Sequence, residues 1–275
     1  AVNDAPVAIA DTASVEEDAA ITNINVILND TDVEGDILTL TAATPDGFGT
    51  VSVNADGISV DYTPAANFNG TETITYTVFD GTDTSTGTLT ITVTAVNDAP
   101  VAIADTATVL EDSALTNIDI VSNDTDVEED TLILITATPD GSGTVSVNVD
   151  GVSVDYTPAA NFNGTETITY TVFDGTNTST GTLTITVTAV NDAPVAIADT
   201  ASVEEDAAIT NINVILNDTD VDITDTLTLI LATTDGSGTV SVNADGVSVD
   251  YTPAANFNGT ETITYIVSDG TDTST

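Results

Sequence analysis

The 275-residue sequence has no lysine, arginine or histidine, and its 45 acidic residues give a formal net charge of −45. Binding to nucleic-acid phosphates needs cationic side chains, so nucleic-acid recognition is excluded. Docking on an anionic membrane surface is excluded for the same reason. Because so many carboxylates repel one another and oppose a compact state, the composition predicts bound cations or a salty medium.

Cysteine, methionine and tryptophan are absent as well. Without cysteine and histidine, the chain cannot form disulfides or the usual zinc, copper and iron–sulfur sites. The side chains of nucleophilic triads and phosphate clamps are also missing, so we expect no enzymatic activity. No run of eighteen apolar residues and no signal peptide are present, and we expect no direct insertion into a membrane.

The chain repeats itself. The stretch AVNDAPVAIADT starts at Ala1, Ala95 and Ala189, a spacing of 94 residues each time. A unit of this length falls within the usual range of domain sizes. The sequence therefore predicts three domains, and the segment GTLTITVT that ends the first two has no counterpart in the third. We interpret the chain as a piece of a longer array, with repeats at 1–94, 95–188 and 189–275.

Apolar residues alternate with threonine in Glu72–Phe79 and in Thr88–Thr94. A strict period of two predicts strands with one buried and one solvated face, and threonine suits the outer face because it is β-branched and polar. No window shows helical spacing, and the 41% apolar content in periodic order argues against disorder. Short strands with turn signals every 8–12 residues predict an all-β chain of immunoglobulin-like β-sandwiches. The expected strands in the first repeat are Val7–Val15, Ile21–Leu28, Ile37–Ala43, Gly49–Val53, Ile58–Thr63, Glu72–Phe79 and Thr88–Thr94, and the first of them is expected to be kinked near Asp11-Thr12.

Aromatic residues are few. Tyr62, Phe68 and Tyr76 could form a platform that stacks on sugar rings, but a small sandwich needs one or two aromatics per sheet to fill its core. We interpret all three as core residues. Because no further aromatic cluster stands out, a carbohydrate-binding role is the weaker hypothesis.

Acidic clusters recur in each repeat at Glu16–Asp18, at Asn29–Asp36 and at the linker pair Asn3-Asp4. Two carboxylates about 4 Å apart repel by about 1 kcal/mol in water and by about 4 kcal/mol at an effective dielectric of 20. A solvated acidic surface is one reading of these clusters. Their recurrence at the same strand ends without any basic partner favours Ca²⁺, which binds six to eight oxygens from carboxylates, amides and carbonyls.

Four motifs resemble those of cadherin repeats. Asn97-Asp98-Ala99-Pro100-Val101 is similar to the N-D-N-x-P linker, and Asp124-Thr125-Asp126 is similar to the D-x-D loop. Glu17 falls where cadherins carry a glutamate on the first strand, and Asp174-Gly175 resembles their A-x-D-G turn. Together they resemble the bacterial cadherin-like tandem repeat of large secreted adhesins. The resemblance implies Greek-key sandwiches in an elongated array with Ca²⁺ between successive domains.

The resemblance also implies which residues would bind Ca²⁺. At the first junction they would be Glu17, Asn97, Asp98, Asp124, Asp126 and Asp174. At the second junction they would be Glu111, Asn191, Asp192, Asp218, Asp220 and Asp269. Towards a domain that precedes the first repeat they would be Asn3, Asp4, Asp30, Asp32 and Asp80.

The chain departs from the cadherin pattern in several places. The acid that opens the linker motif is replaced by Ala95 or Ala189, and the acidic loop before the sixth strand is replaced by Asn67–Gly70. Each junction is therefore expected to hold fewer ions than a junction between two repeats of an animal cadherin. Glu129 replaces Gly35 in the second repeat, and the third acidic loop is one residue longer, so the geometry of the three loops is expected to differ.

The predicted function is that of a structural extender, or stalk, in a secreted or cell-surface adhesin, made rigid by Ca²⁺ at the interdomain junctions. The partners are then the neighbouring repeats of the same chain. The alternative is a self-associating or carbohydrate-binding module, in which other copies of the chain or cell-surface glycans are the partners and a filament is the product. Three near-identical copies of a site between domains argue against a glycosidase built on a carboxylate pair.

Overall fold

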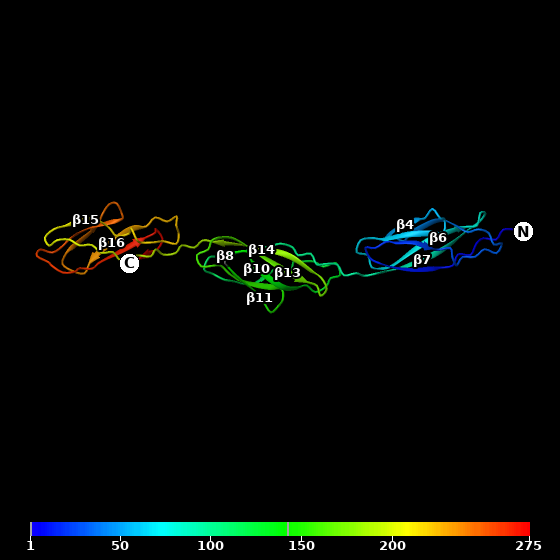
Figure 1. The fold of residues 1–275 in the computed structure, drawn as a ribbon, viewed down its shortest axis with the longest axis horizontal. Helices are drawn as coiled ribbons and strands as arrows, with labels where there is room; N and C mark the ends of the chain where they lie inside the picture. The colour runs from blue at the N-terminus through cyan, green and yellow to red at the C-terminus, as the bar shows by residue number, and fades with distance from the viewer. Residues whose placement is uncertain (1, 142) are drawn as a thin grey trace. The chain divides into compact units, whose positions relative to one another are not determined.

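The computed structural model describes residues 2–141 and 143–275, and every regular element in these ranges is a β-strand (Figure 1). Backbone contacts divide the chain into two compact units. The first comprises the chain up to Ile103 together with Asn123–Ile133 and Thr171–Thr180. The second comprises Ala104–Ser122, Leu134–Tyr170 and Gly181–Thr275. The acidic loops at one end of the second repeat thus group with the first repeat.

The first repeat lies wholly in the first unit and forms two sheets, with strand orders β1-β7-β6-β3 and β2-β5-β4. β1 runs parallel to β7, and the other pairs are antiparallel. The long strands β6 and β7 place Ile74 opposite Leu89 and Glu72 opposite Ile91. The strands are β1 (Asp11–Glu16), β2 (Ile21–Asn25), β3 (Thr39–Pro45), β4 (Gly49–Val53), β5 (Ser59–Pro64), β6 (Gly70–Phe79) and β7 (Thr84–Thr94).

The second repeat has the same strand arrangement, in the orders β10-β13-β14-β8 and β11-β12-β9. Its strands are β8 (Asp105–Leu110), β9 (Leu115–Asp119), β10 (Ile133–Pro139), β11 (Thr144–Val147), β12 (Ser153–Thr157), β13 (Gly164–Phe173) and β14 (Thr178–Thr188). The third repeat forms the sheets β15-β18-β17 and β16-β19-β20. Its strands are β15 (Ile209–Asn213), β16 (Thr228–Thr234), β17 (Thr239–Val242), β18 (Ser248–Thr252), β19 (Ile263–Ser268) and β20 (Thr273–Ser274).

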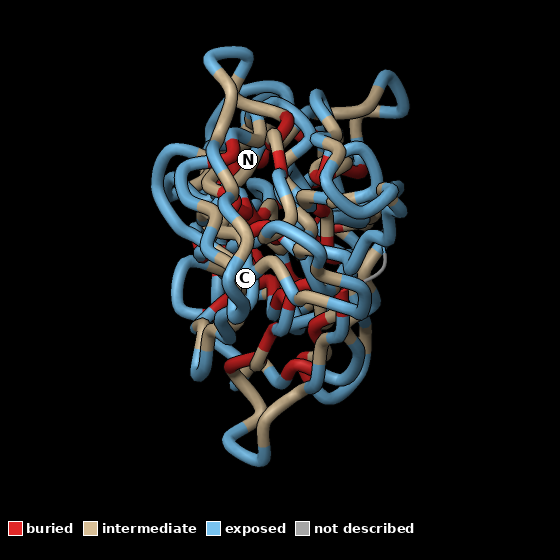
Figure 2. The backbone as a smooth tube through the Cα atoms, turned by 90° about the vertical axis from the view of Figure 1, so that its left-hand side faces the viewer, coloured by how far each residue is buried: buried red, intermediate tan, exposed pale blue. Residues whose placement is uncertain are grey.

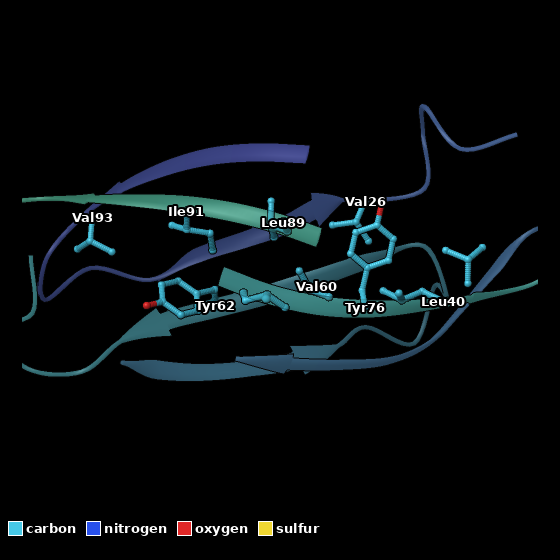
Figure 3. Close-up of a cluster of buried hydrophobic side chains, with 10 residues drawn as sticks. Val26, Leu40, Val60, Tyr62, Tyr76, Leu89, Ile91 and Val93 are labelled. Atoms are coloured by element: carbon cyan, nitrogen blue, oxygen red, sulfur yellow. The ribbon is translucent and has the colours of Figure 1, made fainter. Parts of the chain in front are cut away.

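The core of each sandwich lies between its two sheets, where the inward residues of the alternating strands meet. Figure 3 shows Val60 and Tyr62 from β5 and Leu89, Ile91 and Val93 from β7 between the strand layers of the first repeat. Burying an aliphatic side chain of this kind stabilises the fold by about 1.5–3 kcal/mol. Buried residues alternate with exposed ones along the strands, as the predicted period of two requires, and the loops are mostly exposed (Figure 2).

The prediction of all-β immunoglobulin-like sandwiches in tandem is confirmed, with differences at strand ends. The expected first strand is interrupted: Val7 forms an isolated bridge with Thr31, and β1 begins only at Asp11. The core assignment is right for Tyr62 and Tyr76, which are fully buried. Phe68 is only partly buried, and its ring stacks on the half-exposed Phe48 with centroids 4.6 Å apart.

A buried glutamate on the sixth strand of the repeat was not expected from the pattern. Glu72 is fully buried and accepts hydrogen bonds from the backbone N–H groups of Gly47 (3.1 Å) and Phe48 (2.8 Å). The Tyr62 hydroxyl lies 3.4 Å from the same carboxylate, and burial together with the Glu72 charge raises the pKa of Tyr62 to about 12. Glu72 therefore fixes the loop between β3 and β4 against the core.

Candidate metal centre

The linker that follows the first repeat is held by acidic and amide side chains on both sides. The backbone N–H of Val96 donates to Oε1 of Glu17 (2.7 Å), a residue that is only 3% exposed. The Asn97 amide donates to Oδ2 of Asp174 (3.0 Å), and the Asp98 N–H donates to Oε2 of Glu128 (3.1 Å). The structure thus connects the linker to Glu17 of the first repeat and to two acids of the second.

The D-x-D loop of the second repeat is shaped by its own aspartates. Oδ1 of Asp124 accepts the N–H of Ile103 (2.7 Å), which ties the loop to the segment after the linker. Oδ1 of Asp126 accepts the N–H groups of Glu128 and Asp130, both at 3.1 Å. Aspartate readily closes such turns because its side chain can accept backbone donors two residues further on. One oxygen of each carboxylate is therefore used to build the loop.

The second junction repeats this arrangement within the second unit. Glu111 is 3% exposed and accepts the N–H of Val190 (2.6 Å). Asn191 donates to Asp269 and Asp272 (3.0 Å each), and the Asp192 N–H donates to Asp222 (2.8 Å). The two loop aspartates accept backbone donors like their counterparts: Asp218 from Ile197 (2.7 Å) and Asp220 from Asp222 (2.9 Å).

The matching linker and loop residues of the first repeat make similar hydrogen bonds, without a glutamate from a preceding repeat. Asn3 donates to Asp80 and Asp83 (3.0 Å each), and Asp30 accepts the N–H of Ile9 (2.7 Å). Asp32 accepts the N–H groups of Glu34 and Asp36, while Asp4 is exposed. The sequence-predicted residues therefore lie at equivalent places in all three repeats.

The second oxygens of nine of these carboxylates test whether the sites suit a cation. Within residues 2–141 and 143–275, these nine oxygens are buried and have no hydrogen-bond donor. Leaving a buried polar atom without a partner costs about 1–3 kcal/mol, and more for a charged group. The chain offers no cationic side chain to satisfy them. The atoms concerned are Oε2 of Glu17, Oε1 of Glu128 and Oδ2 of Asp30, Asp32, Asp98, Asp126, Asp192, Asp218 and Asp220.

Two groups of pKa shifts distinguish the acids in these sites. Burial raises the pKa of Asp192, and the neighbouring carboxylates of Asp112 and Asp222 raise it further. Burial also raises the pKa of Asp30. By contrast, the N–H of Asp83 holds the pKa of Asp80 below its ordinary value, so that this acid stays charged at neutral pH. The charged form of Asp192 is therefore repelled by neighbouring carboxylates, and a bound cation would offset this repulsion.

Across residues 2–141 and 143–275, no three acidic side chains are grouped closely enough to hold a metal ion. The oxygens without a hydrogen-bond donor belong to the linker and the D-x-D loop at both junctions and, at the first junction, also to Glu17 of the preceding repeat. The equivalent Oε2 of Glu111 accepts a hydrogen bond from Asn163 (3.5 Å). A cation at either junction therefore requires these side chains to draw together around it.

Two acids that hold the linkers were not predicted from the sequence. Glu128 and Asp222 accept the N–H of the linker aspartate in the first and second junctions. Both lie two residues after the second aspartate of the D-x-D loop, where the first repeat carries Glu34. This recurrence at one position of three copies is the signal that could have identified them.

The sandwich architecture and the acid-lined linkers define a class: tandem immunoglobulin-like β-sandwich repeats. Three repeats of human CDH23 (EC21-23) are similar over 98% of this chain and 96% of theirs, with 17% identity and a TM-score of 0.57. The protocadherin GammaB4 extracellular domain is similar over 98% of this chain and 50% of its own length, with 16% identity and a TM-score of 0.53. These likenesses show the fold.

The family model "Bacterial Ig domain" matches residues 3–92, 97–186 and 191–275. The chain belongs to this family, whose repeats are typical extracellular modules and typically not enzymes. An endo-fucoidan hydrolase of glycoside hydrolase family 107 is also similar over 99% of this chain, which spans 43% of that enzyme, with 19% identity and a TM-score of 0.30. A score this low carries no argument about activity.

No curated protein sequence matches the chain. Among the described residues there is no helix long and apolar enough to cross a membrane.

Proposed function

We propose that this chain is an extender segment of a secreted or cell-surface adhesin, non-enzymatic, and made rigid by Ca²⁺ bound at the junctions between its repeats at 1–94, 95–188 and 189–275. The observation that carries the proposal is the set of buried, donor-free carboxylate oxygens, which recur at equivalent positions in the D-x-D loops (Asp32, Asp126 and Asp220) and in the linkers (Asp98 and Asp192). Glu17 is the strongest member, because it is 3% exposed and Oε2 has no partner.

The ligand atoms determine which cation the site would bind. They are carboxylate, amide and backbone oxygens, which suit the hard cation Ca²⁺. Magnesium keeps several of its waters and rarely occupies an all-protein cage. The residues that would hold Ca²⁺ at the first junction are Glu17, Asn97, Asp98, Asp124, Asp126 and Asp174, together with Glu128.

Binding would stiffen the junction because the ligands come from three segments. Glu17 belongs to the first repeat, Asp98 to the linker and Asp126 to the second repeat. Without a cation, repulsion between the carboxylates of these segments opposes the hydrogen bonds that hold the linker, so the linker can reorient. Extracellular Ca²⁺ modules bind with dissociation constants of about 10⁻⁴–10⁻³ M, which suits the medium outside a cell.

Asp126→Asn should weaken Ca²⁺ binding at the first junction by about tenfold or more, because a neutral amide replaces the donor-free carboxylate oxygen. The remaining amide oxygen can still accept the two N–H groups that Asp126 accepts, so the loop should keep its shape. Titration calorimetry with Ca²⁺ measures the change. Asp130→Asn is the matched control, since this exposed acid lies in the same loop. Equal affinities for the two variants would contradict the assignment of the D-x-D loop.

Asp192→Asn should have opposite effects without and with Ca²⁺. The pKa of Asp192 is raised in the folded state, which means that its charged form opposes folding. This destabilisation is absent at low pH and appears as the pH rises through the raised pKa. At pH 7 in chelator, the variant should therefore melt at a higher temperature than the parent chain. In millimolar Ca²⁺ the order should reverse, because the variant lacks a charged ligand. A solvated acidic surface predicts the same order in both buffers.

A further inference from the structure

One tyrosine on the sixth strand of each repeat has its hydroxyl beside the D-x-D loop. In the first repeat, the Tyr76 hydroxyl lies 2.8 Å from the carbonyl oxygen of Ile9. It also lies 3.0 Å from Oδ2 of Asp11 and 3.4 Å from Oδ1 of Asp30. Tyr76 is fully buried and lies between the strand layers with the other core residues (Figure 3). The first aspartate of the loop is therefore in contact with a group that the core holds in place.

Two carboxylates share this hydroxyl. A tyrosine hydroxyl has one hydrogen, so Tyr76 can donate to only one acceptor at a time. Burial raises the pKa of Asp11, the hydrogen bond from Tyr76 lowers it, and the charge of Asp30 raises it again. The hydroxyl thus stabilises the charged form of Asp11, whereas the two carboxylates repel each other.

The same contacts fix the segment that leads into β1. The N–H of Ile9 donates to Oδ1 of Asp30 (2.7 Å), and the carbonyl oxygen of Ile9 accepts the Tyr76 hydroxyl. The Asn29 amide lies 3.4 Å from the same carbonyl oxygen. Side chains therefore satisfy both backbone groups of Ile9, between the bridge at Val7 and the start of β1. Tyr76 and Asp30 together connect this segment, the D-x-D loop and the sixth strand.

The arrangement recurs in the other repeats. The Tyr170 hydroxyl donates to Oδ2 of Asp105 (3.3 Å). The Tyr265 hydroxyl lies 2.9 Å from the carbonyl oxygen of Ile197 and 3.1 Å from Oδ1 of Asp218. The other oxygen of Asp218 is buried and has no hydrogen-bond donor in the described part of the chain. The hydroxyl thus holds one oxygen of this loop aspartate and leaves the second for a cation.

We propose that the tyrosine hydroxyl of each repeat positions the first D-x-D aspartate for Ca²⁺, an inference that rests on the proposed function. An aspartate already held by one oxygen loses less conformational freedom when its other oxygen binds the cation. Binding draws the charge of this aspartate towards the cation and weakens its hydrogen bond with the hydroxyl. The hydroxyl then donates to the second carboxylate, which is that of Asp11, Asp105 or Asp199.

Tyr170→Phe should lower the Ca²⁺ affinity of the first junction about fivefold, since one hydrogen bond to a charged group is lost. Tyr156→Phe is the matched control, because it removes a hydroxyl that donates to Glu166 (2.8 Å) in the same sandwich. The control also loses a buried hydrogen bond, but it should change the affinity of the first junction by less than about twofold. Calorimetric titration measures both variants. Tyr265→Phe makes the same test at the second junction, where the hydroxyl lies beside Asp218.

Two further measurements do not depend on affinity. In chelator, amide hydrogen exchange in fragments that contain residues 123–130 should be faster in Tyr170→Phe than in the parent chain or in Tyr156→Phe, because the loop loses its anchor. The chain has no tryptophan, so tyrosine dominates its near-UV absorption. Addition of Ca²⁺ should change this absorption in the parent chain and in Tyr156→Phe, and the change should be smaller in Tyr170→Phe.

The outcomes separate this inference from the proposed function. A parent chain that binds no Ca²⁺ contradicts the proposed function and this inference with it. Ca²⁺ binding by the parent chain with equal affinity in Tyr170→Phe contradicts this inference alone. Equal losses of affinity in Tyr170→Phe and Tyr156→Phe also contradict it, because the stability of the sandwich rather than the position of the hydroxyl would then control binding.

Discussion

Glu17→Gln should lower the Ca²⁺ affinity of the first junction about 100-fold, equivalent to about 2.8 kcal/mol. Glu17 is nearly inaccessible, and its Oε1 is fixed by the Val96 N–H, so Oε2 is held beside the linker without a donor. Glutamine keeps the size of the side chain and an oxygen for Val96, but it removes the charge that attracts the cation. Calorimetric titration should show the loss of the first-junction sites while those of the second junction persist.

Glu16→Gln is the matched control for this variant. Glu16 is the preceding residue, but it is exposed on the outer face of β1. Its replacement removes the same formal charge from the same strand and should change the affinity by less than about twofold, since exposed charges are screened by solvent and salt. If both variants lost affinity equally, net charge rather than a built site would control Ca²⁺ binding.

Glu72→Ala should destabilise the first repeat by about 3–5 kcal/mol. The change leaves the N–H groups of Gly47 and Phe48 without their acceptor, and it opens a cavity beneath the loop between β3 and β4. The hydroxyl of Tyr62 keeps only its contact with the carbonyl of Phe48 (3.5 Å). Hydrogen exchange followed by mass spectrometry measures the effect on this repeat, because fragments that carry the substitution differ in mass from those of the other repeats. The second and third repeats should exchange as in the parent chain.

Glu72→Gln separates the loss of the acceptor from the loss of the charge. The amide oxygen can still accept one of the backbone donors, so we expect a cost well below that of alanine. A stability of Glu72→Ala equal to that of the parent would show that the buried carboxylate does not fix the loop.

The repeat, the strands and the core could be predicted because they depend on local patterns. Strict alternation in β6 and β7 marked the inward residues, and Ile74, Tyr76, Leu89 and Ile91 are all fully buried. The sequence predicted a kink near Asp11, where β1 begins, but not the separate bridge of Val7, because its partner Thr31 is distant in the sequence. The same alternation places Glu72 on the inward face, but what permits burial of its charge could not be predicted, because the backbone donors come from a loop about 25 residues earlier.

In the candidate metal centre, too, residues marked by local motifs could be predicted, and those that depend on distant contacts could not. Motif resemblance pointed to Glu17, Asp98 and Asp126, and the structure places a donor-free oxygen on each of them. Glu128 was missed because its role depends on a hydrogen bond from the linker, which sequence spacing does not reveal. Whether the repeats form the expected elongated array stays a prediction that depends on the cation.

Small-angle X-ray scattering of the whole chain, first in chelator and then in millimolar Ca²⁺, tests the central claim most directly. Binding at the junctions should increase the maximum dimension and give a rod-like profile, because the linkers lose their freedom to bend. The Glu17→Gln variant should lengthen less than the parent, and Glu16→Gln should behave like the parent. A profile that does not change when Ca²⁺ is added would contradict the account and leave the acids as a solvated surface.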